Sequence, residues 1–228
     1  KLMPIVKNNY DKIFQKISKE YDKNLIKFGN SPKSVGQLNI CTLEKRLSIL
    51  TKVGDLKNSK ILDFGCGIGY LYSYLKKKLK FKGEYVGYDI SNEMINFANK
   101  KYKNVRFENK DILSSKINER FDYVIINGTF NNKINQNFNW IKKTLKILFK
   151  KTDKAIAFNN ITSYVDYFDK KLYYAKPEKI FSFCKSELSP LVLLRHDYQI
   201  KDKTLPYEFT TYVYKTGIKN RKSLSKIR

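Results

Sequence analysis

The sequence predicts an α/β fold: a mostly parallel sheet of seven strands with helices on both faces, a C-terminal antiparallel hairpin and an N-terminal helical cap. After residue 60 the apolar residues alternate repeatedly between the spacing of a strand and that of a helix, as in parallel strands covered by helices. The last two strand-like segments are joined by the polar stretch "QIKDKTLP", which indicates a hairpin. The length of 228 residues and the hydrophobic content of 42% suffice for one core.

Seven segments have strand length and are rich in β-branched or aromatic residues. In chain order they span 60–65, 84–89, 105–109, 121–127, 154–160, 190–198 and 208–215. Helices are predicted at 69–80, after Ser91, at 136–150 and from Pro177. Ser91 is a typical N-cap because its hydroxyl can accept a hydrogen bond from the first helical turn. Pro177 suits a first turn, where its missing N–H is not needed.

Residues 1–59 are predicted to form a helical cap or lid. An amphipathic helix within 8–29 and a second helix at 40–53 are separated by "GNSPKSVG", whose Gly and Pro residues end helices. Residues 60–216 then form the main domain, and residues 217–228 form a basic tail.

The chain carries a formal net charge of +25, which in general points to nucleic acid or another polyanion. Only six of its 46 basic residues are arginines, although Arg is the residue favoured for bidentate phosphate and base contacts. The lysines are spread along the chain. A solvated lysine-rich surface and a polyanion partner therefore both stay open.

The cysteines, Cys41, Cys66 and Cys184, follow no pattern and have no second ligand nearby, so neither a disulfide framework nor a metal site is expected. No apolar run approaches the length of a membrane span, and no secretory pattern opens the chain. These features predict a cytoplasmic protein.

The stretch "ILDFGCGIGY", residues 61–70, places three glycines directly after a buried strand, with Asp63 two positions ahead of the first. Bare backbone at this turn lets a ligand lie beside a helix N-terminus. Dinucleotide sites favour G-x-G-x-x-G, whereas this loop reads G-C-G-I-G, and the carboxylate of Asp63 would repel a pyrophosphate. Asp89 lies 20 residues beyond Gly69, where a carboxylate can bind ribose hydroxyls. A ligand with a ribose and an ammonium group but no phosphates is S-adenosylmethionine.

These motifs resemble those of the class I S-adenosylmethionine-dependent methyltransferases, which have a Rossmann-like fold. "ILDFGCGIG" is similar to the family's first motif, "YVGYDIS" to its second-strand acidic motif and "ENKDI" to its third, and "FDYVIINGTF" occupies the fourth-strand position. The resemblance covers residues 60–215. It implies cofactor contacts by Arg46, Asp63, Gly65, Cys66, Gly67, Gly69, Asp89, Ile90, Asp111, Ile112 and Asn127.

Within these contacts, the resemblance implies that Asp63 and the glycine loop hold the methionine part and that Asp89 takes the ribose hydroxyls. Asp111 would accept from the adenine amino group. Asp111 could instead be only a helix cap, and the isoleucines only core.

The N-terminal segments "YDKNLIKFGNSPKSVG" and "LEKRL" also resemble those of a subset of bacterial small-molecule methyltransferases, whose chains end in strands of the "LRHDY" and "YEFTTYVYK" type. Some of these proteins are encoded with surface-polysaccharide genes. In that comparison Arg46 would pair with the cofactor carboxylate, a role that suits a guanidinium. Where relatives often carry Trp after "SVG", this chain has Gln37.

The acceptor site is predicted at the ends of the fourth, fifth and sixth strands. His196 and Asp197 follow a sixth strand that runs parallel to the first, so they are the candidates for a general base. A lone histidine is also a common structural hydrogen-bonding residue. Asn127, Asn131, Asn159 and Asn160 end at the same edge, where they can bind hydroxyls or cap helices. The tetrad "NPPY" of base-amino methylation is absent, since this chain has "NGTF".

The sequence therefore predicts a methyltransferase acting on a small molecule, with an oxygen of a sugar or phosphorylated metabolite as acceptor. An RNA methyltransferase is the first alternative, because of the charge. A cofactor-binding protein without catalysis is the second.

Overall fold

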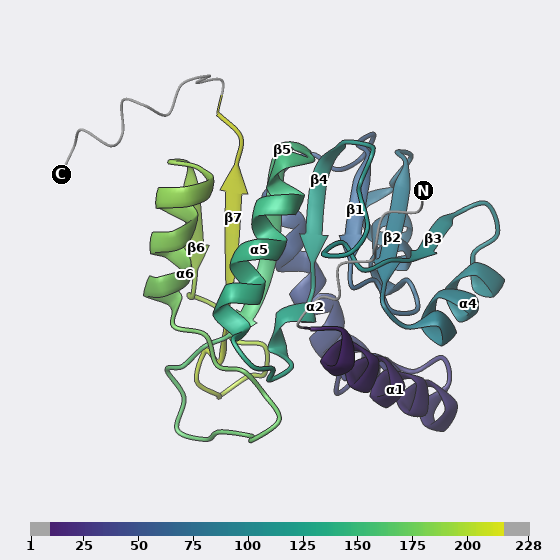
Figure 1. Ribbon diagram of the computed structural model, residues 1–228, viewed down its shortest axis with the longest axis horizontal. Helices are drawn as coiled ribbons and strands as arrows, with labels where there is room; N and C mark the ends of the chain where they lie inside the picture. The colour runs from purple at the N-terminus through teal and green to yellow at the C-terminus, as the bar shows by residue number, and fades with distance from the viewer. Residues whose placement is uncertain (1–9, 217–228) are drawn as a thin grey trace, which may run out of the picture.

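The computed structural model describes residues 10–216, whose strands form one seven-stranded sheet in the order β3-β2-β1-β4-β5-β7-β6 (Figure 1). The strands are β1 Ile61–Phe64, β2 Tyr85–Asp89, β3 Arg106–Asn109, β4 Phe121–Ile126, β5 Thr152–Ile161, β6 Val192–Arg195 and β7 Glu208–Tyr214. Strands β1 to β5 are mutually parallel, and β7 is antiparallel to both β5 and β6. The predicted fold class is confirmed, including the C-terminal hairpin.

The helices alternate with the strands as the periodicity predicts. They are α1 Asp11–Phe28, α2 Ile40–Leu50, α3 Tyr70–Leu79, α4 Asn92–Lys101, α5 Asn137–Lys150 and α6 Pro177–Phe183, with short turns η1 Pro32–Val35, η2 Thr51–Val53, η3 Thr129–Asn131 and η4 Cys184–Leu188. Ser91 caps α4 by accepting from the N–H of Met94 at 3.0 Å, and Pro177 opens α6. Both predicted helix starts are confirmed.

Two predicted elements are shorter than expected. The strand predicted over 190–198 is reduced to the four residues of β6, which is an edge strand and, within residues 10–216, pairs with β7 alone. The segment from Pro177 to Leu188 is α-helical only to Phe183 and ends in the π-helical turn η4. The N–H of Ser189 closes that turn on the carbonyl of Cys184 at 2.9 Å.

Each face of the sheet has its own layer of helices. Helices α5 and α6 cover one face, where Trp140 and Ile180 pack against Leu62 and Phe158. Helices α2, α3 and α4 cover the other, where the strands contribute side chains such as Ile125. Side chains alternate between the faces along each strand, so a central strand is buried on both sides.

The two N-terminal helices differ in position. Helix α2 packs onto the sheet, with Leu43, Leu47 and Leu50 in the same cluster as α3. Helix α1 lies beyond the carboxyl ends of the parallel strands (Figure 1) and contacts η1 and α4. Residues 1–9 of the predicted cap and the predicted basic tail at 217–228 lie outside the described residues.

The central strand supplies a test of this packing. Leu62 of β1 is fully buried, whereas Leu193 of the edge strand β6 is 49% exposed. We expect Leu62→Ala to lower the free energy of unfolding by about 2–5 kcal/mol, through lost burial and the cavity left behind. Leu193→Ala is the matched control and should cost less than about 1 kcal/mol. Urea unfolding of both variants measures the difference, and equal effects would contradict the assigned core.

Candidate functional site

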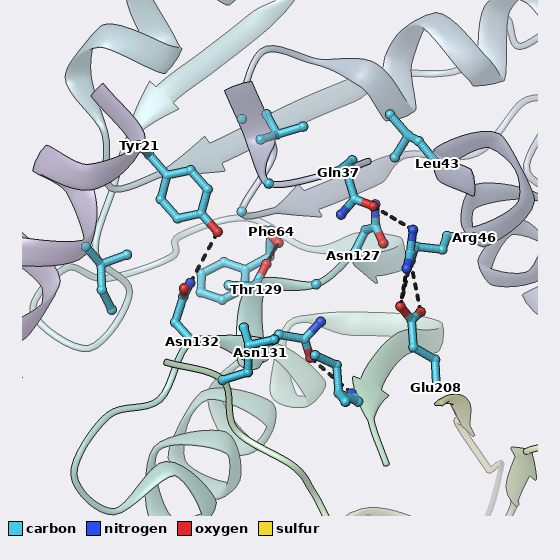
Figure 2. A pocket seen from close by; sticks show the side chains of 18 of the residues that line it. Tyr21, Gln37, Leu43, Arg46, Phe64, Asn127, Thr129, Asn131, Asn132 and Glu208 are labelled. Carbon is cyan, nitrogen blue, oxygen red and sulfur yellow. Dashed lines mark hydrogen bonds and ion pairs between the residues drawn. The ribbon is translucent and has the colours of Figure 1, made fainter. Parts of the chain in front are cut away.

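The carboxyl ends of the parallel strands open into a deep pocket with a cavity volume of about 980 Å³ (Figure 2). The pocket lies where the strand order reverses between β1 and β4, the place where open α/β sheets bind ligands. Its walls come from the segments after β1 to β5, the β6–β7 connection, α1, η1 and α2. Ligand pockets span about 300–1,000 Å³, so this one is large enough for more than one small ligand.

Ten of the eleven residues predicted to contact the cofactor line this pocket. They are Arg46, Asp63, Gly65, Cys66, Gly67, Asp89, Ile90, Asp111, Ile112 and Asn127. The exception is Gly69, which lies at the start of α3 with a φ of +81°. A Cβ there would lie 2.8 Å from the ring of Tyr102, so Gly69 serves helix packing.

The glycine loop is held between β2 and the cap. The N–H groups of Gly65 and Cys66 donate to the carbonyl of Tyr88 at 2.7 and 3.1 Å. Gly67 has a φ of +52°, and a Cβ on it would lie 2.7 Å from the side chain of Val35 in η1. The loop therefore requires glycine at this position, because the cap approaches its backbone closely.

Two carboxylates lie beside the loop, that of Asp63 buried and that of Asp89 half-buried. Asp89 accepts from the N–H of Gly67 at 2.8 Å and from the N–H of Ser91 at 2.9 Å. Asp63 accepts from the hydroxyl of Tyr85 at 2.6 Å. Burial raises the pKa of Asp63 to about 7, with the hydrogen bond from Tyr85 opposing this and the charge of Asp89 adding to it. Burial likewise raises the pKa of Asp89.

The segment after β3 forms the far end of the pocket. Asp111 accepts from the N–H of Leu113 at 2.9 Å and from the hydroxyl of Ser114 at 3.1 Å. It thus caps the turn that follows as well as lining the pocket. Ile112 is buried and Ile90 is half-buried against the core, so both pack into the protein while facing the cavity.

Arg46 is bound entirely by protein groups. Its Nε donates to Glu208 at 2.7 Å, its Nη1 donates to Gln37 at 2.8 Å and to the carbonyl of Thr42 at 3.4 Å, and its Nη2 donates to Tyr207 and Glu208. Burial acts to lower the pKa of the guanidinium, but the charge of Glu208 and the hydrogen bonds to Glu208 and Tyr207 together more than offset it, so the pKa is raised. All five N–H donors are therefore engaged, and none is left over for a ligand in this arrangement.

His196 and Asp197 are not among the residues that line the pocket. The Nε2 of His196 lies 2.9 Å from the carbonyl of Pro206, in the β6–β7 connection. Asp197 is exposed and paired with Arg195 at 2.9 Å, and this partner lowers the pKa of Asp197. The structure thus brings the asparagine-bearing ends of β4 and β5 to the pocket, but not the two residues that follow β6.

Several pocket residues have no clear motif in the sequence. Glu208, only 3% exposed, starts β7 and holds Arg46. In the sequence, a glutamate begins a strand whose other residues are aromatic or β-branched, and this is the one signal that could have identified Glu208 as a functional residue. Tyr21 of α1 accepts from Asn132 across the pocket at 3.3 Å (Figure 2). This contact depends on tertiary packing alone.

The predicted asparagines separate into two sets. Asn127, Asn131 and Asn159 are joined to the pocket wall by hydrogen bonds, and the first two line the cavity. Asn160 points to the opposite face of β5, fully buried, without a hydrogen-bonding partner in the described part of the chain. Across residues 10–216, no group of three or more His, Cys, Asp or Glu side chains is placed to hold a metal ion. No described helix is long and apolar enough to span a membrane.

The chain is similar in sequence to known methyltransferases. A family model described as a methyltransferase domain matches residues 55–201. A Mycobacterium tuberculosis protein named as a methyltransferase, Rv1506c, is 36% identical over 167 residues, which cover 69% of this chain and 93% of that protein.

Solved structures share the fold at low identity. The magnesium protoporphyrin IX methyltransferase ChlM of Synechocystis PCC 6803, with bound S-adenosylmethionine, has a TM-score of 0.64 and 15% identity, covering 94% of this chain and all of that one. The plantazolicin methyltransferase BpumL, in complex with a triazolic desmethylPZN analogue and S-adenosylhomocysteine, has a TM-score of 0.60 and 15% identity, covering 90% of this chain and 99% of that one.

The buried carboxylate of Asp63 predicts a pH dependence of stability. Its pKa is raised from 3.8 to about 7, so the folded state binds this proton more tightly than the unfolded state does. The contribution of Asp63 to the free energy of unfolding is thus greatest at low pH and is lost as the pH rises through about 7. In the wild type, this loss lowers the free energy of unfolding between about pH 5 and about pH 8. Replacing Asp63 by Asn should make that decline in the free energy of unfolding smaller, by on the order of 2 kcal/mol.

Urea unfolding at the two pH values measures this effect. Asp55→Asn, at an exposed position, is the control and should leave the decline unchanged. A decline of the same size in Asp63→Asn and the wild type would contradict the assigned pKa.

Proposed function

Since the chain belongs to the methyltransferase-domain family and takes S-adenosylmethionine as its methyl donor, we propose that it methylates an oxygen of a small molecule, a sugar or a phosphorylated metabolite. The observation that carries this proposal is the pocket itself. One side of it has the carboxylates of Asp63 and Asp89 and the glycine loop, and the other side has amides and tyrosines together with lysines and carboxylates.

The carboxylate side fits the cofactor. Asp63 is buried and Asp89 is half-buried, and neither forms an ion pair with a cationic side chain of the described residues. A ligand with an ammonium or sulfonium charge supplies the missing positive charge and favours the ionised form of both carboxylates. Ile90 and Ile112 line the adjoining region, where an apolar ring is accommodated.

The chain's own contribution to the reaction is alignment and exclusion of water. The bound cofactor supplies a methyl group on a positively charged sulfur, which an acceptor displaces in line. Helix α1, η1, the segment after β5 and the β6–β7 connection surround the pocket mouth and exclude water around the two ligands.

The opposite side of the pocket supports a polar acceptor. Asn127, Asn131 and Asn132 line it beside Tyr21, and Lys201 comes from the β6–β7 connection. Amide and hydroxyl groups match the hydroxyls of a sugar, and a lysine at the rim matches a phosphate. The enclosure by α1 and the loops favours a small acceptor over a long polymer.

The compartment proposed is the cytoplasm. All three cysteines, Cys41, Cys66 and Cys184, are free thiols, and the last two are buried. Thiols left unpaired are typical of reducing compartments.

Cofactor binding is tested by calorimetry with S-adenosylhomocysteine. Asp89→Asn keeps the size of the side chain but replaces one acceptor oxygen by a donor, so the bonds from Gly67 and Ser91 cannot both form. We expect affinity for S-adenosylhomocysteine to fall by about tenfold or more. Asp153→Ala, exposed at the opposite end of β5, is the control. A folded wild-type protein that binds neither S-adenosylhomocysteine nor S-adenosylmethionine would refute the cofactor assignment.

The net charge of +25 favours one other candidate, an RNA methyltransferase. We expect methyl label to enter the small-molecule fraction of a cell extract and not its RNA. RNA binding should be non-specific, with a Kd above about 1 μM at physiological salt. Methylated RNA, together with tight binding that weakens steeply with added salt, would support the RNA enzyme instead. Cofactor affinity without transfer to any fraction would support a binding protein without catalysis.

A further inference from the structure

Three side-chain amides of the pocket are oriented by the groups that hold their oxygens. Gln37 accepts from Nη1 of Arg46 at 2.8 Å, and Asn131 accepts from the backbone N–H of Ile161 at 3.2 Å. A guanidinium and a backbone N–H can only donate, so the atom that each amide offers to them must be its oxygen. The NH2 groups of Gln37 and Asn131 are therefore the ends left to face other partners.

Asn127 is oriented through a relay. The oxygen of Asn159 accepts from the backbone N–H of Gly128 at 2.7 Å, which makes the other end of Asn159 its NH2 group. That NH2 donates to the oxygen of Asn127 at 3.3 Å and to Glu208 at 3.2 Å. The NH2 of Asn127 is thus also the end left free, and all three amides line the cavity (Figure 2).

Two of these NH2 groups converge over Gly128. A Cβ placed on Gly128 would lie 3.6 Å from Nδ2 of Asn131 and 3.7 Å from Nε2 of Gln37, with no other described atom beyond the adjoining residues within 4 Å. Glycine therefore leaves a space that two donors border. A group with two acceptor oxygens, placed over Gly128, can accept from both.

We propose that the NH2 groups of Gln37, Asn127 and Asn131 form the acceptor subsite, and that they select a carboxylate as the group that is methylated. This inference rests on the proposed function and narrows it to a metabolite that carries a carboxylate. Neutral donors match a singly charged carboxylate. An amine brings N–H donors of its own, and the amide oxygens that could accept from it are already bound.

A carboxylate also needs no base. Its oxygen forms the new bond to the methyl carbon while the bond from that carbon to sulfur breaks. The bonding pair stays on sulfur, which becomes neutral, and no proton is released. A hydroxyl would have to lose its proton to a base. The two residues predicted for that role, His196 and Asp197, lie outside the pocket, and Glu208 is held by Arg46. Asp166 and Asp169 line the pocket from the segment after β5, but a carboxylate acceptor needs no base at all. The products are a methyl ester and S-adenosylhomocysteine.

The chemistry of the product distinguishes the acceptor classes. The protein is incubated with methyl-labelled S-adenosylmethionine and the small-molecule fraction of a cell extract, and the product is treated with mild alkali. A carboxyl methyl ester releases its label as volatile methanol, whereas methyl ethers, methylamines and methyl phosphates keep it. We expect most of the label to become volatile. Label that stays bound would overturn the carboxylate assignment and leave the proposed function intact, whereas no transfer to any fraction would count against both.

Two isosteric variants test the subsite. Gln37→Glu and Asn131→Asp each replace an NH2 donor by an oxygen, so they should lower the base-labile methylation by about tenfold to a hundredfold. Their affinity for S-adenosylhomocysteine, measured by calorimetry, should stay within about twofold of the wild type. Asn135→Asp introduces the same change at an exposed position outside the pocket and should have no effect.

Two results would contradict this role. If both variants methylate as the wild type does, the amides do not bind the acceptor. If Gln37→Glu weakens binding of S-adenosylhomocysteine as much as it lowers methylation, then the amide holds the carboxylate of the cofactor and not that of the acceptor.

Discussion

The carboxylate of Asp89 connects the parts on which the pocket depends. It accepts from Gly67 in the glycine loop and from Ser91 at the start of α4, so the first two strand ends are held in one position. Ser91 in turn donates to Asp22 of α1 at 2.5 Å, which ties the cap to the same point. Without this acceptor, the glycine loop and the start of α4 would each lose a hydrogen bond, and Ser91, which anchors α1 through Asp22, would lose the bond that positions its backbone.

A buried ion pair organises the opposite wall. Arg46 from α2 and Glu208 from β7 are 162 residues apart in the sequence, and both are largely buried. Their contacts reach Gln37, Tyr207 and Asn159, so the orientation of the neighbouring amides depends on this pair. The pocket thus has the carboxylates of Asp63 and Asp89 beside the glycine loop, and beyond β4 it has NH2 donors beside Gly128. A positively charged cofactor on the first side and a carboxylate over Gly128 match that arrangement.

Much of the fold could be predicted because it follows from local patterns. The strand and helix periods located all seven strands, and Ser91 and Pro177 marked helix starts by chemistry that acts within one turn. The ends of β6 and α6 were missed for the opposite reason. An edge strand ends where its single partner stops pairing with it, and the π-helical turn is closed by Ser189, outside the helical pattern. His196 was expected at the pocket because it follows a strand that runs parallel to β1. The direction of β6 does not determine how far its end lies from the pocket, and His196 does not line it.

By itself, the sequence determined the sheet, the glycine loop and the carboxylates beside it, because each depends on residues close together along the chain or on one repeating period. Only the tertiary structure decided the acceptor wall. Gln37, Asn131 and Glu208 come from three distant segments, and each is an unremarkable polar residue until its partner is known. The direction in which an amide presents its NH2 group is set by what binds its oxygen, and no local pattern contains that information.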